Sequence, residues 1–427
     1  MNPRRAKTSR IAALAPCLIP LLTLSCAYLR GVGGPREFPE TPAVEDPLTA
    51  VDARYRGALR VPLVAEWSQE LPDEGIWAIS RFEAGQPLVD GDRVLVGSSR
   101  ASGLLSLDRR SGVVRQTTPT VNPVQCRPLK LDEGLLVADT GGYVYRLTND
   151  GEVLWRFHAG GPIYETPVVD EARVYVATTT DVLLALDLDT GSWLWSYRPE
   201  ERLTRSELSV LGSTRALLRD GLIYAGLSDG RLVCLDATTG TRQWDMDIGE
   251  GRFVDVDATA VFTEGGLLVT GAYSGPVVAV DVNRQTVVWR FESGVNGKIT
   301  SMYGRLYFSD ETGTLRCLDA ATGLEDWSWA PKGSKDLLNT PVGQGRILLV
   351  AHNKGDLYAI DAFSGDVLWR HEPRQSYLGA VRPPTIVERQ VLYVTNDGLI
   401  HSLRAPPGMY ETHSGEPALR DSRHLGW

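Results

Sequence analysis

The stretch 355–370, which reads GDLYAIDAFSGDVLWR, sets the pattern for most of this chain. An alternating apolar run ends at Asp361, a Ser364-Gly365 turn follows, and a second apolar run ends at Trp369. An aspartate side chain can accept hydrogen bonds from nearby backbone, and glycine reaches a positive φ without steric cost. The stretch therefore predicts two short strands joined by a tight turn.

The same pattern recurs along the chain, so the predicted hairpin is a repeat unit. The other copies are 103–116, 142–155, 181–195, 230–244, 275–289 and 313–327. Gln116 replaces the final tryptophan in one copy, and Gln285 replaces the turn glycine in another. Alternating runs between the copies supply two more strands for each unit. Four strands recurring about every 40 residues are typical of a β-propeller blade.

The two ends of the repeat array complement each other. After Trp369 the chain supplies strands at 381–388, 390–397 and 399–404, without a tryptophan strand to complete the unit. Near the start, 63–70 is a tryptophan strand with no unit before it. Pairing these segments would leave no free sheet edge. The sequence therefore predicts an all-β fold, an eight-bladed β-propeller of four-stranded blades over residues 61–404, whose last blade is closed by the N-terminal strand.

Residues 1–26 have the features of a lipoprotein signal peptide. A basic segment precedes an apolar stretch, which ends at Ser25-Cys26. This end resembles a bacterial lipobox, with departures at Thr23 and Leu24, and the alternative is ordinary signal cleavage beside an incidental cysteine. If the lipobox is used, Cys26 becomes the acylated N-terminus. The absence of an aspartate next to Cys26 resembles outer-membrane sorting.

The segments that flank the repeats have the composition of unstructured chain. Residues 27–60 are rich in proline, glycine and acidic residues and lack periodicity, which predicts a flexible tether. Residues 405–427 are predicted to form a polar tail.

The tryptophans at the repeat position have a structural and a functional interpretation, and the structural one is favoured. Each ring would pack between neighbouring blades; the alternative is an aromatic binding box. These structural repeat residues are Trp67, Trp155, Trp195, Trp244, Trp289, Trp327 and Trp369. The turn aspartates are likewise interpreted as backbone acceptors and not as paired catalytic carboxylates.

The residue types that carry chemistry form no recognisable catalytic motif. The six histidines lack metal-ligand spacing, and the five cysteines include no CxxC. A nucleophile elbow, a Walker loop and a dinucleotide fingerprint are all absent from the sequence. The net charge of -9 argues against a nucleic-acid partner. We therefore expect a protein that is not an enzyme, with no metal site and no cofactor.

The function is expected where the repeats lengthen, because regular repeats vary where they bind. Two long connections, 199–212 and 245–259, each run from the outer strand of one blade to the inner strand of the next. They should therefore emerge side by side on one face. Arg205, Asp255 and Asp257 would give this face mixed charge; the alternative is solvated loop charge without a partner.

The D-x-x-[ST]-G-x-x-x-W turn resembles the PQQ-type blades of quinoprotein dehydrogenases and the blades of the BamB family of outer-membrane assembly lipoproteins. The resemblance to BamB covers nearly the whole chain and includes the lipobox. It also includes three short stretches: VDVDAT at 254–259, AYSG at 272–275 and LLNTPV at 337–342.

The BamB resemblance implies a function, a location and a partner. It implies a non-catalytic periplasmic scaffold, a monomer within a complex, that is lipid-anchored to the outer membrane, binds a POTRA domain of BamA and supports insertion of β-barrel proteins. Asp255 and Asp257 match the acidic pair of the family, and Arg205 matches its arginine. The family has apolar residues beside that arginine. This chain has Leu203 and Thr204 there, so it matches the family poorly at these two positions.

Two other functions remain open at this point. A PQQ-dependent oxidoreductase is one, but the enzymes concerned are longer and carry adjacent cysteines and an aspartate base beside a Ca²⁺ site. This chain has no vicinal cysteines, and a shared blade does not imply a shared cofactor, so PQQ is not expected. The other is a propeller that binds a different envelope protein or a polysaccharide.

Overall fold

The computed structural model describes residues 59–73, 83–200, 215–249, 255–256, 258–333, 336–353, 355–373, 380 and 382–406. The described residues all belong to one compact unit, 52–427. The described residues form strands, turns and loops, and they include no helix that is long and apolar enough to span a membrane.

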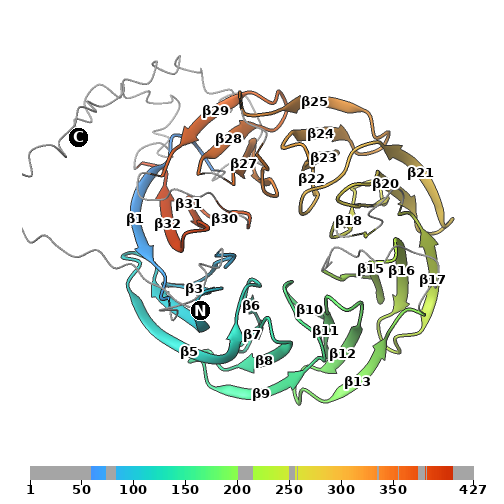
Figure 1. Cartoon of the computed structure of the whole chain (residues 1–427), viewed down its shortest axis with the longest axis horizontal. Coiled ribbons are helices and arrows are strands. Elements are labelled where there is room, and N and C mark those ends of the chain that lie inside the picture. Colours follow the sequence, from blue (N-terminus) through green and yellow to red (C-terminus); the bar gives the residue numbers. More distant parts are fainter. Residues whose placement is uncertain are drawn as a thin grey trace, which may run out of the picture. The chain divides into compact units, whose positions relative to one another are not determined.

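Eight four-stranded antiparallel sheets surround a central axis, as Figure 1 shows. This arrangement is a β-propeller and confirms the predicted fold class. Blade 1 consists of β2 (Leu88–Asp90), β3 (Arg93–Gly97), β4 (Ser102–Asp108) and β5 (Val114–Pro123), and blade 2 of β6 (Leu129–Lys130), β7 (Leu135–Ala138), β8 (Tyr143–Leu147) and β9 (Val153–His158). Blade 3 consists of β10 (Val168–Val169), β11 (Arg173–Ala177), β12 (Leu183–Asp187) and β13 (Trp193–Tyr197), and blade 4 of β14 (Leu217–Arg219), β15 (Leu222–Gly226), β16 (Arg231–Asp236) and β17 (Arg242–Asp247). Blade 5 consists of β18 (Val261–Phe262), β19 (Leu268–Gly271), β20 (Val277–Asp281) and β21 (Thr286–Phe291), and blade 6 of β22 (Thr300–Met302), β23 (Arg305–Ser309), β24 (Leu315–Asp319) and β25 (Glu325–Trp329). Blade 7 consists of β26 (Val342–Gln344), β27 (Ile347–Ala351), β28 (Leu357–Asp361) and β29 (Val367–His371), and blade 8 of β30 (Thr385–Val387), β31 (Gln390–Val394), β32 (Leu399–Arg404) and β1 (Val64–Glu70).

The first strand of each blade lies nearest the axis and the fourth lies at the rim (Figure 1). Five of these inner strands are directly preceded by a proline. The prolines are Pro87, Pro128, Pro167, Pro341 and Pro384. Proline has no backbone N–H to donate, so a position just outside an edge strand costs the sheet no hydrogen bond.

The N-terminal strand β1 completes the last blade, which confirms the predicted closure. It pairs antiparallel with β32, with Val64 opposite Arg404 and Glu70 opposite Leu399. The ends of the repeat array therefore meet within one sheet, in the order β1-β32-β31-β30.

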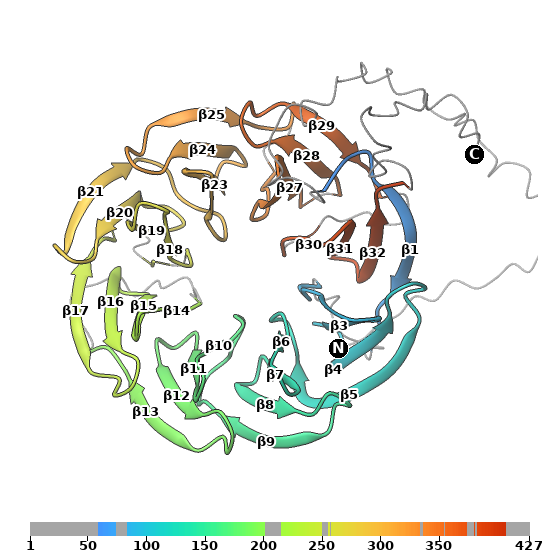
Figure 2. The same cartoon turned by 180° about the vertical axis from the view of Figure 1, so that it is seen from behind.

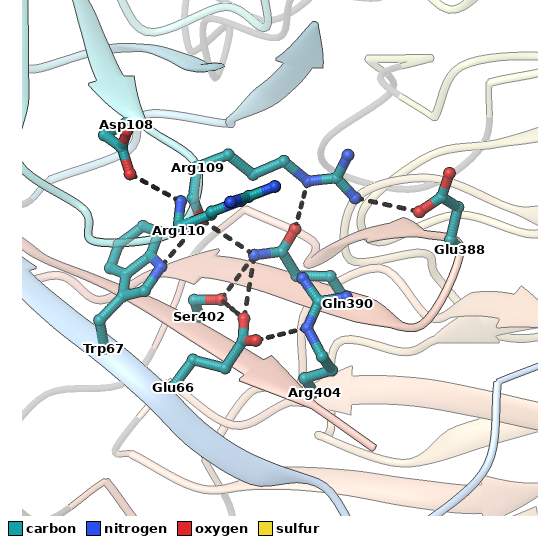
Figure 3. Close-up of polar contacts among 9 residues, drawn as sticks. All are labelled: Glu66, Trp67, Asp108, Arg109, Arg110, Glu388, Gln390, Ser402 and Arg404. Carbon is teal, nitrogen blue, oxygen red and sulfur yellow. Dashed lines mark hydrogen bonds and ion pairs between the residues drawn. The ribbon is translucent and has the colours of Figure 1, made fainter. Parts of the chain in front are cut away.

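A polar network fixes the closing strand to its neighbours (Figure 3). The Glu66 carboxylate of β1 accepts a hydrogen bond from Ser402 Oγ at 2.8 Å and pairs with Arg404, both in β32. Gln390 of β31, which is fully buried, donates from Nε2 to Ser402 Oγ at 2.8 Å. Its Oε1 accepts from Arg109 Nε of blade 1 at 2.7 Å. The network thus joins the N-terminal strand, the C-terminal strands and the first blade.

The apolar core is continuous from blade to blade. One cluster of buried residues includes Leu95 of blade 1, Leu136 of blade 2 and Val176 of blade 3. Each sheet therefore buries its faces against the neighbouring sheets, so the stability of a blade depends on its neighbours.

Five of the repeat tryptophans lie against a glycine in the turn of the following blade. A Cβ added to that glycine would come within 2.4–2.8 Å of an indole atom. Each indole Nε1 also donates a hydrogen bond, of 3.0–3.3 Å, to the carbonyl of the residue after the turn aspartate. The pairs are Trp67–Gly112, Trp155–Gly191, Trp195–Gly240, Trp289–Gly323 and Trp327–Gly365.

The other repeat positions differ from these pairs. Gln116 stands at a tryptophan position, and its Nε2 donates to Asp150 O in the next turn at 2.7 Å, much as an indole does. Trp244 precedes the blade whose turn carries Gln285 in place of glycine, with φ 53°. Trp369 precedes the closing blade and stacks on His371, with ring centroids 5.6 Å apart.

Candidate functional site at the inter-blade connections

The two long connections leave neighbouring blades. The first leaves β13 of blade 3 and enters β14 of blade 4, and the second leaves β17 of blade 4 and enters β18 of blade 5. Each starts after a rim strand and ends before an inner strand, and the two junctions are adjacent in the ring. The residues at 201–214, 250–254 and 257 lie outside the described part of the chain.

Of the residues predicted to bind a partner or to be lipidated, Asp255 alone belongs to the described part of the chain. Leu203, Arg205 and Asp257, and the predicted lipidation site Cys26, lie outside it. Asp255 is described and is only 5% exposed. So little exposed area suits a residue that positions the connection more than one that contacts a partner directly, and its partner-binding role stays a prediction.

The second connection rests directly on blade 4 near Asp255. Val256 N donates a hydrogen bond to Leu227 O at 3.1 Å. A Cβ on Gly226 would lie 2.2 Å from Val256 O, so no larger residue fits there without movement. The backbone of this connection is therefore held close to the loop that joins β15 to β16.

Arg231, which sequence reasoning did not single out, ties both connections to blade 4. Its side chain is 4% exposed. Its guanidinium donates from Nε to Asp229 Oδ2 at 2.6 Å and from Nη1 to Asp245 Oδ2 at 3.0 Å. Nη2 donates to Glu200 O, where the first connection begins, at 3.4 Å. The signal in the sequence was an arginine that opens an otherwise apolar strand, RLVCLD.

The electrostatics at Arg231 favour its charged form. Hydrogen bonds to Asp229 and then to Asp245 outweigh burial and raise the pKa of Arg231. A neighbouring contact links blades 3 and 4: the Asp181 carboxylate accepts hydrogen bonds from Ser228 N, at 3.1 Å, and from Ser228 Oγ. Burial raises the pKa of Asp181. Polar contacts therefore join the start of the first connection and the strand before the second to blade 4.

The turn aspartates accept backbone hydrogen bonds. Asp108 Oδ1 accepts from Arg110 N at 2.9 Å and from Ser111 N at 2.7 Å. These bonds, with Ser111 contributing most, lower the pKa of Asp108 to about 2. The corresponding contacts are made by Asp187, Asp236, Asp281, Asp319 and Asp361.

The described cysteines are buried free thiols. Burial raises the pKa of Cys126 and Cys234 to about 11 and that of Cys317 to about 12. A thiol with a pKa this high is a poor nucleophile at neutral pH. Within the described ranges there is also no group of three or more His, Cys, Asp or Glu residues that could hold a metal ion.

Comparison with known proteins identifies the family. The family model described as "Outer membrane protein assembly factor BamB" matches residues 124–329 and 313–418, which is more than half of the chain. The chain belongs to the BamB family.

Individual relatives agree with this assignment. The BamB outer membrane protein assembly factor of Shewanella oneidensis is 25% identical over 264 residues, covering 60% of this chain and 65% of the relative, just under two thirds of its length. The Burkholderia pseudomallei protein is 24% identical over 364 residues, covering 82% and 93%. The crystal structure of BamB from Moraxella catarrhalis matches with a TM-score of 0.67 at 18% identity, over 81% of this chain and 100% of that one. At this identity the structural match shows the fold alone.

The sequence of an enzyme also matches part of this chain. The quinohemoprotein alcohol dehydrogenase of Comamonas testosteroni is 31% identical over 170 residues, which are 38% of this chain and 19% of the enzyme. A match to a fifth of an enzyme is accounted for by shared propeller blades and does not carry the activity of the whole enzyme.

Proposed function

We propose that this chain is a periplasmic scaffold that supports the assembly and insertion of outer-membrane β-barrel proteins. Membership of the BamB family carries the proposal, because its members are named as outer membrane protein assembly factors. The proposed mechanism is binding and positioning without bond chemistry. The proposed location is the periplasmic face of the outer membrane, with a lipid anchor on Cys26.

The proposed partner is the POTRA region of a BamA-like protein. The proposed contact surface is formed by the two connections, with Leu203, Arg205, Asp255 and Asp257 as the partner-binding residues. Arg231 supports this assignment, because it holds the start of one connection and the strand before the other with a side chain that is 4% exposed. Loops that start from a rigid scaffold can present contact residues with a small entropic cost on binding.

Co-purification from native membranes tests the partner. Tagged full-length protein should recover the BamA homologue of the same organism. The double variant Arg205→Ala/Asp257→Ala should recover at least about tenfold less, because truncation of anchors buried in an interface costs on the order of 1–2 kcal/mol each. Arg284→Ala is the matched control, since its side chain is 82% exposed at a turn of blade 5. If the wild-type protein recovers no BamA homologue, the partner is wrong; equal recovery by the double variant would show that the site is elsewhere.

The match to the Comamonas enzyme favours one competing function, a PQQ-dependent oxidoreductase. Reconstitution of the full-length protein with PQQ and Ca²⁺ separates the two functions. The scaffold proposal expects no quinone absorbance on the protein after gel filtration and no oxidation of alcohols with an artificial electron acceptor. Retained absorbance together with turnover would establish the enzyme instead.

A further inference from the structure

Four basic side chains and one carboxylate converge where inner strands begin. Arg127, Arg215 and Lys298 hold equivalent positions, each two residues before the first strand of its blade, namely β6, β14 and β22. Glu165 and Arg382 each lie three residues before the first strands β10 and β30. The first strands surround the axis of the ring (Figure 2). Because all five residues precede first strands, they belong to the same end of the central channel that these strands enclose.

Glu165 joins blades across this channel. Its Oε2 accepts a hydrogen bond from Lys298 Nζ of blade 6 at 2.6 Å, and its Oε1 accepts from Arg382 Nη1 of blade 8 at 2.7 Å. The Glu165 side chain is 8% exposed. Burial alone would raise the pKa of Glu165, but Lys298 and Arg382 outweigh it and lower the pKa to about 2. Glu165 is therefore ionised at neutral pH and neutralises one of these two positive charges.

Arg127 and Arg215 are each partly buried, and no described carboxylate forms an ion pair with either of them. The Nε atom of each guanidinium is buried without a hydrogen-bond partner. Burial, and then the charge of Arg215, lower the pKa of Arg127. Burial also lowers the pKa of Arg215, although the charge of Glu165 acts in the opposite direction. These two partly buried cations thus repel each other.

The local charge runs against that of the whole chain. The five channel residues carry a formal charge of +3, whereas the chain carries -9. Even partial burial of a guanidinium is costly unless an anion faces it. An acidic protein that gathers four partly buried cations around a single carboxylate has the electrostatic features of an anion site.

A cavity of about 310 Å³ lies beside this cluster. Glu165, Lys298, Arg382, Asn339 and Thr340 are among the residues that line it, whereas Arg127 and Arg215 lie outside its lining. This volume is at the lower end of that of small-molecule sites, which is about 300–1,000 Å³. The cavity therefore suits a small molecule and is too small for a folded partner.

We propose that this end of the channel binds a small soluble anion through Arg127 and Arg215, with Lys298 and Arg382 adding to the attraction. The recognised group is an oxyanion, either a phosphate or a carboxylate, because the planar fork of a guanidinium matches both in bidentate geometry. The cavity beside Glu165 offers room for the rest of the ligand. Arg215 also lies just before β14, at the end of the first long connection, so a bound anion would hold that end of the connection in place.

Calorimetric titration of the purified full-length protein tests this, with inorganic pyrophosphate in one arm, citrate in another, and sodium chloride at matched ionic strength as the reference. We expect saturable binding of at least one of the two anions, with a rise in Tm that chloride does not produce. Binding of pyrophosphate alone indicates a phosphate ligand, and binding of citrate alone a carboxylate ligand. No saturable binding of either anion at about 1 mM would overturn the proposal.

Variants test the assigned residues. Arg127→Gln/Arg215→Gln should weaken anion binding at least tenfold, while Arg284→Gln, whose side chain is 82% exposed, should bind as the wild type does. Without anion, the double variant should also have a higher Tm than the wild type, because two partly buried like charges that repel each other are removed. Arg127→Lys is the milder variant in case the double change prevents folding; it keeps the charge but loses the fork and should bind more weakly. Unchanged affinity in these channel variants would contradict the assignment.

Discussion

The indole of Trp67 lies so close to Gly112 that a Cβ on the glycine would come within 2.4 Å of the ring. Trp67 belongs to the N-terminal strand β1, and its Nε1 donates to Arg109 O of blade 1 at 3.0 Å. The strand that completes the last blade thus also forms the contact between the last blade and the first. Closure of the ring depends on the same tryptophan–glycine contact that joins four other pairs of blades.

The closeness of this contact makes Gly112 sensitive to substitution. Gly112→Ala should destabilise the protein by about 2–4 kcal/mol, combining a left-handed backbone at φ 73° with a clash against Trp67. Gly221→Ala is the control, since Gly221 has φ 75° but nothing within 4 Å of a new Cβ, and it should cost about 1 kcal/mol. Equal losses in urea denaturation would mean that the Trp67 contact contributes nothing.

The turn of blade 5 should be improvable. Gln285 stands where other turns have glycine and has φ 53°, a conformation that is strained for a residue with a Cβ. Gln285→Gly should therefore stabilise the protein by about 1 kcal/mol in chemical denaturation. Gln285→Ala removes the same side chain but keeps the Cβ, so it should not stabilise; a gain of the same size in both variants would show that backbone strain is not the cause.

The closing strand should make stability depend on pH through His401. His401 of β32 is hydrogen-bonded through Nδ1 to Ser68 Oγ of β1 at 2.8 Å, and its side chain is buried. Burial, and then the nearby His371, lower the pKa of His401 from 6.5 to about 4. The neutral form is thus favoured in the folded protein, and the unfolded chain takes up a proton first as the pH falls.

The contribution of His401 is therefore complete above pH 6.5 and is lost as the pH falls through about 4. The loss should amount to about 3 kcal/mol in the free energy of unfolding over this range. His401→Gln should flatten this part of the pH profile, whereas His158→Gln, at an exposed position, should leave the slope unchanged. A His401→Gln profile as steep as that of the wild type would contradict this prediction.

The framework under the connections should depend on Arg231. Arg231→Leu leaves Asp229 and Asp245 without their buried partner and should cost about 3 kcal/mol. Arg242→Leu removes an arginine that pairs with the same Asp245 at 3.5 Å but is 48% exposed, so it should cost less than about 1 kcal/mol. Urea denaturation of the two variants compares a buried and an exposed arginine on one carboxylate, and similar losses would show that burial of Arg231 is unimportant.

The parts of the fold that follow from local chemistry could be predicted from the sequence. The pattern from Asp361 to Trp369 specifies a tight turn and a rim strand within a few residues, so its copies reveal the blades and their closure. The polar contacts between blades could not be predicted in this way. Glu165 meets Lys298 and Arg382 across 133 and 217 residues of chain, and Arg231 meets Glu200 and Asp245 from different segments. No local period records such contacts, because they depend on how the ring brings separate blades together.

The affinity of the purified full-length protein for the purified BamA homologue of the same organism tests the central claim most directly. The account predicts saturable binding with one-to-one stoichiometry, weakened about tenfold or more by Arg205→Ala/Asp257→Ala and unchanged by Arg284→Ala. Absence of binding, or equal affinity of the wild type and the double variant, would contradict the claim that this chain acts as an assembly scaffold through its inter-blade connections.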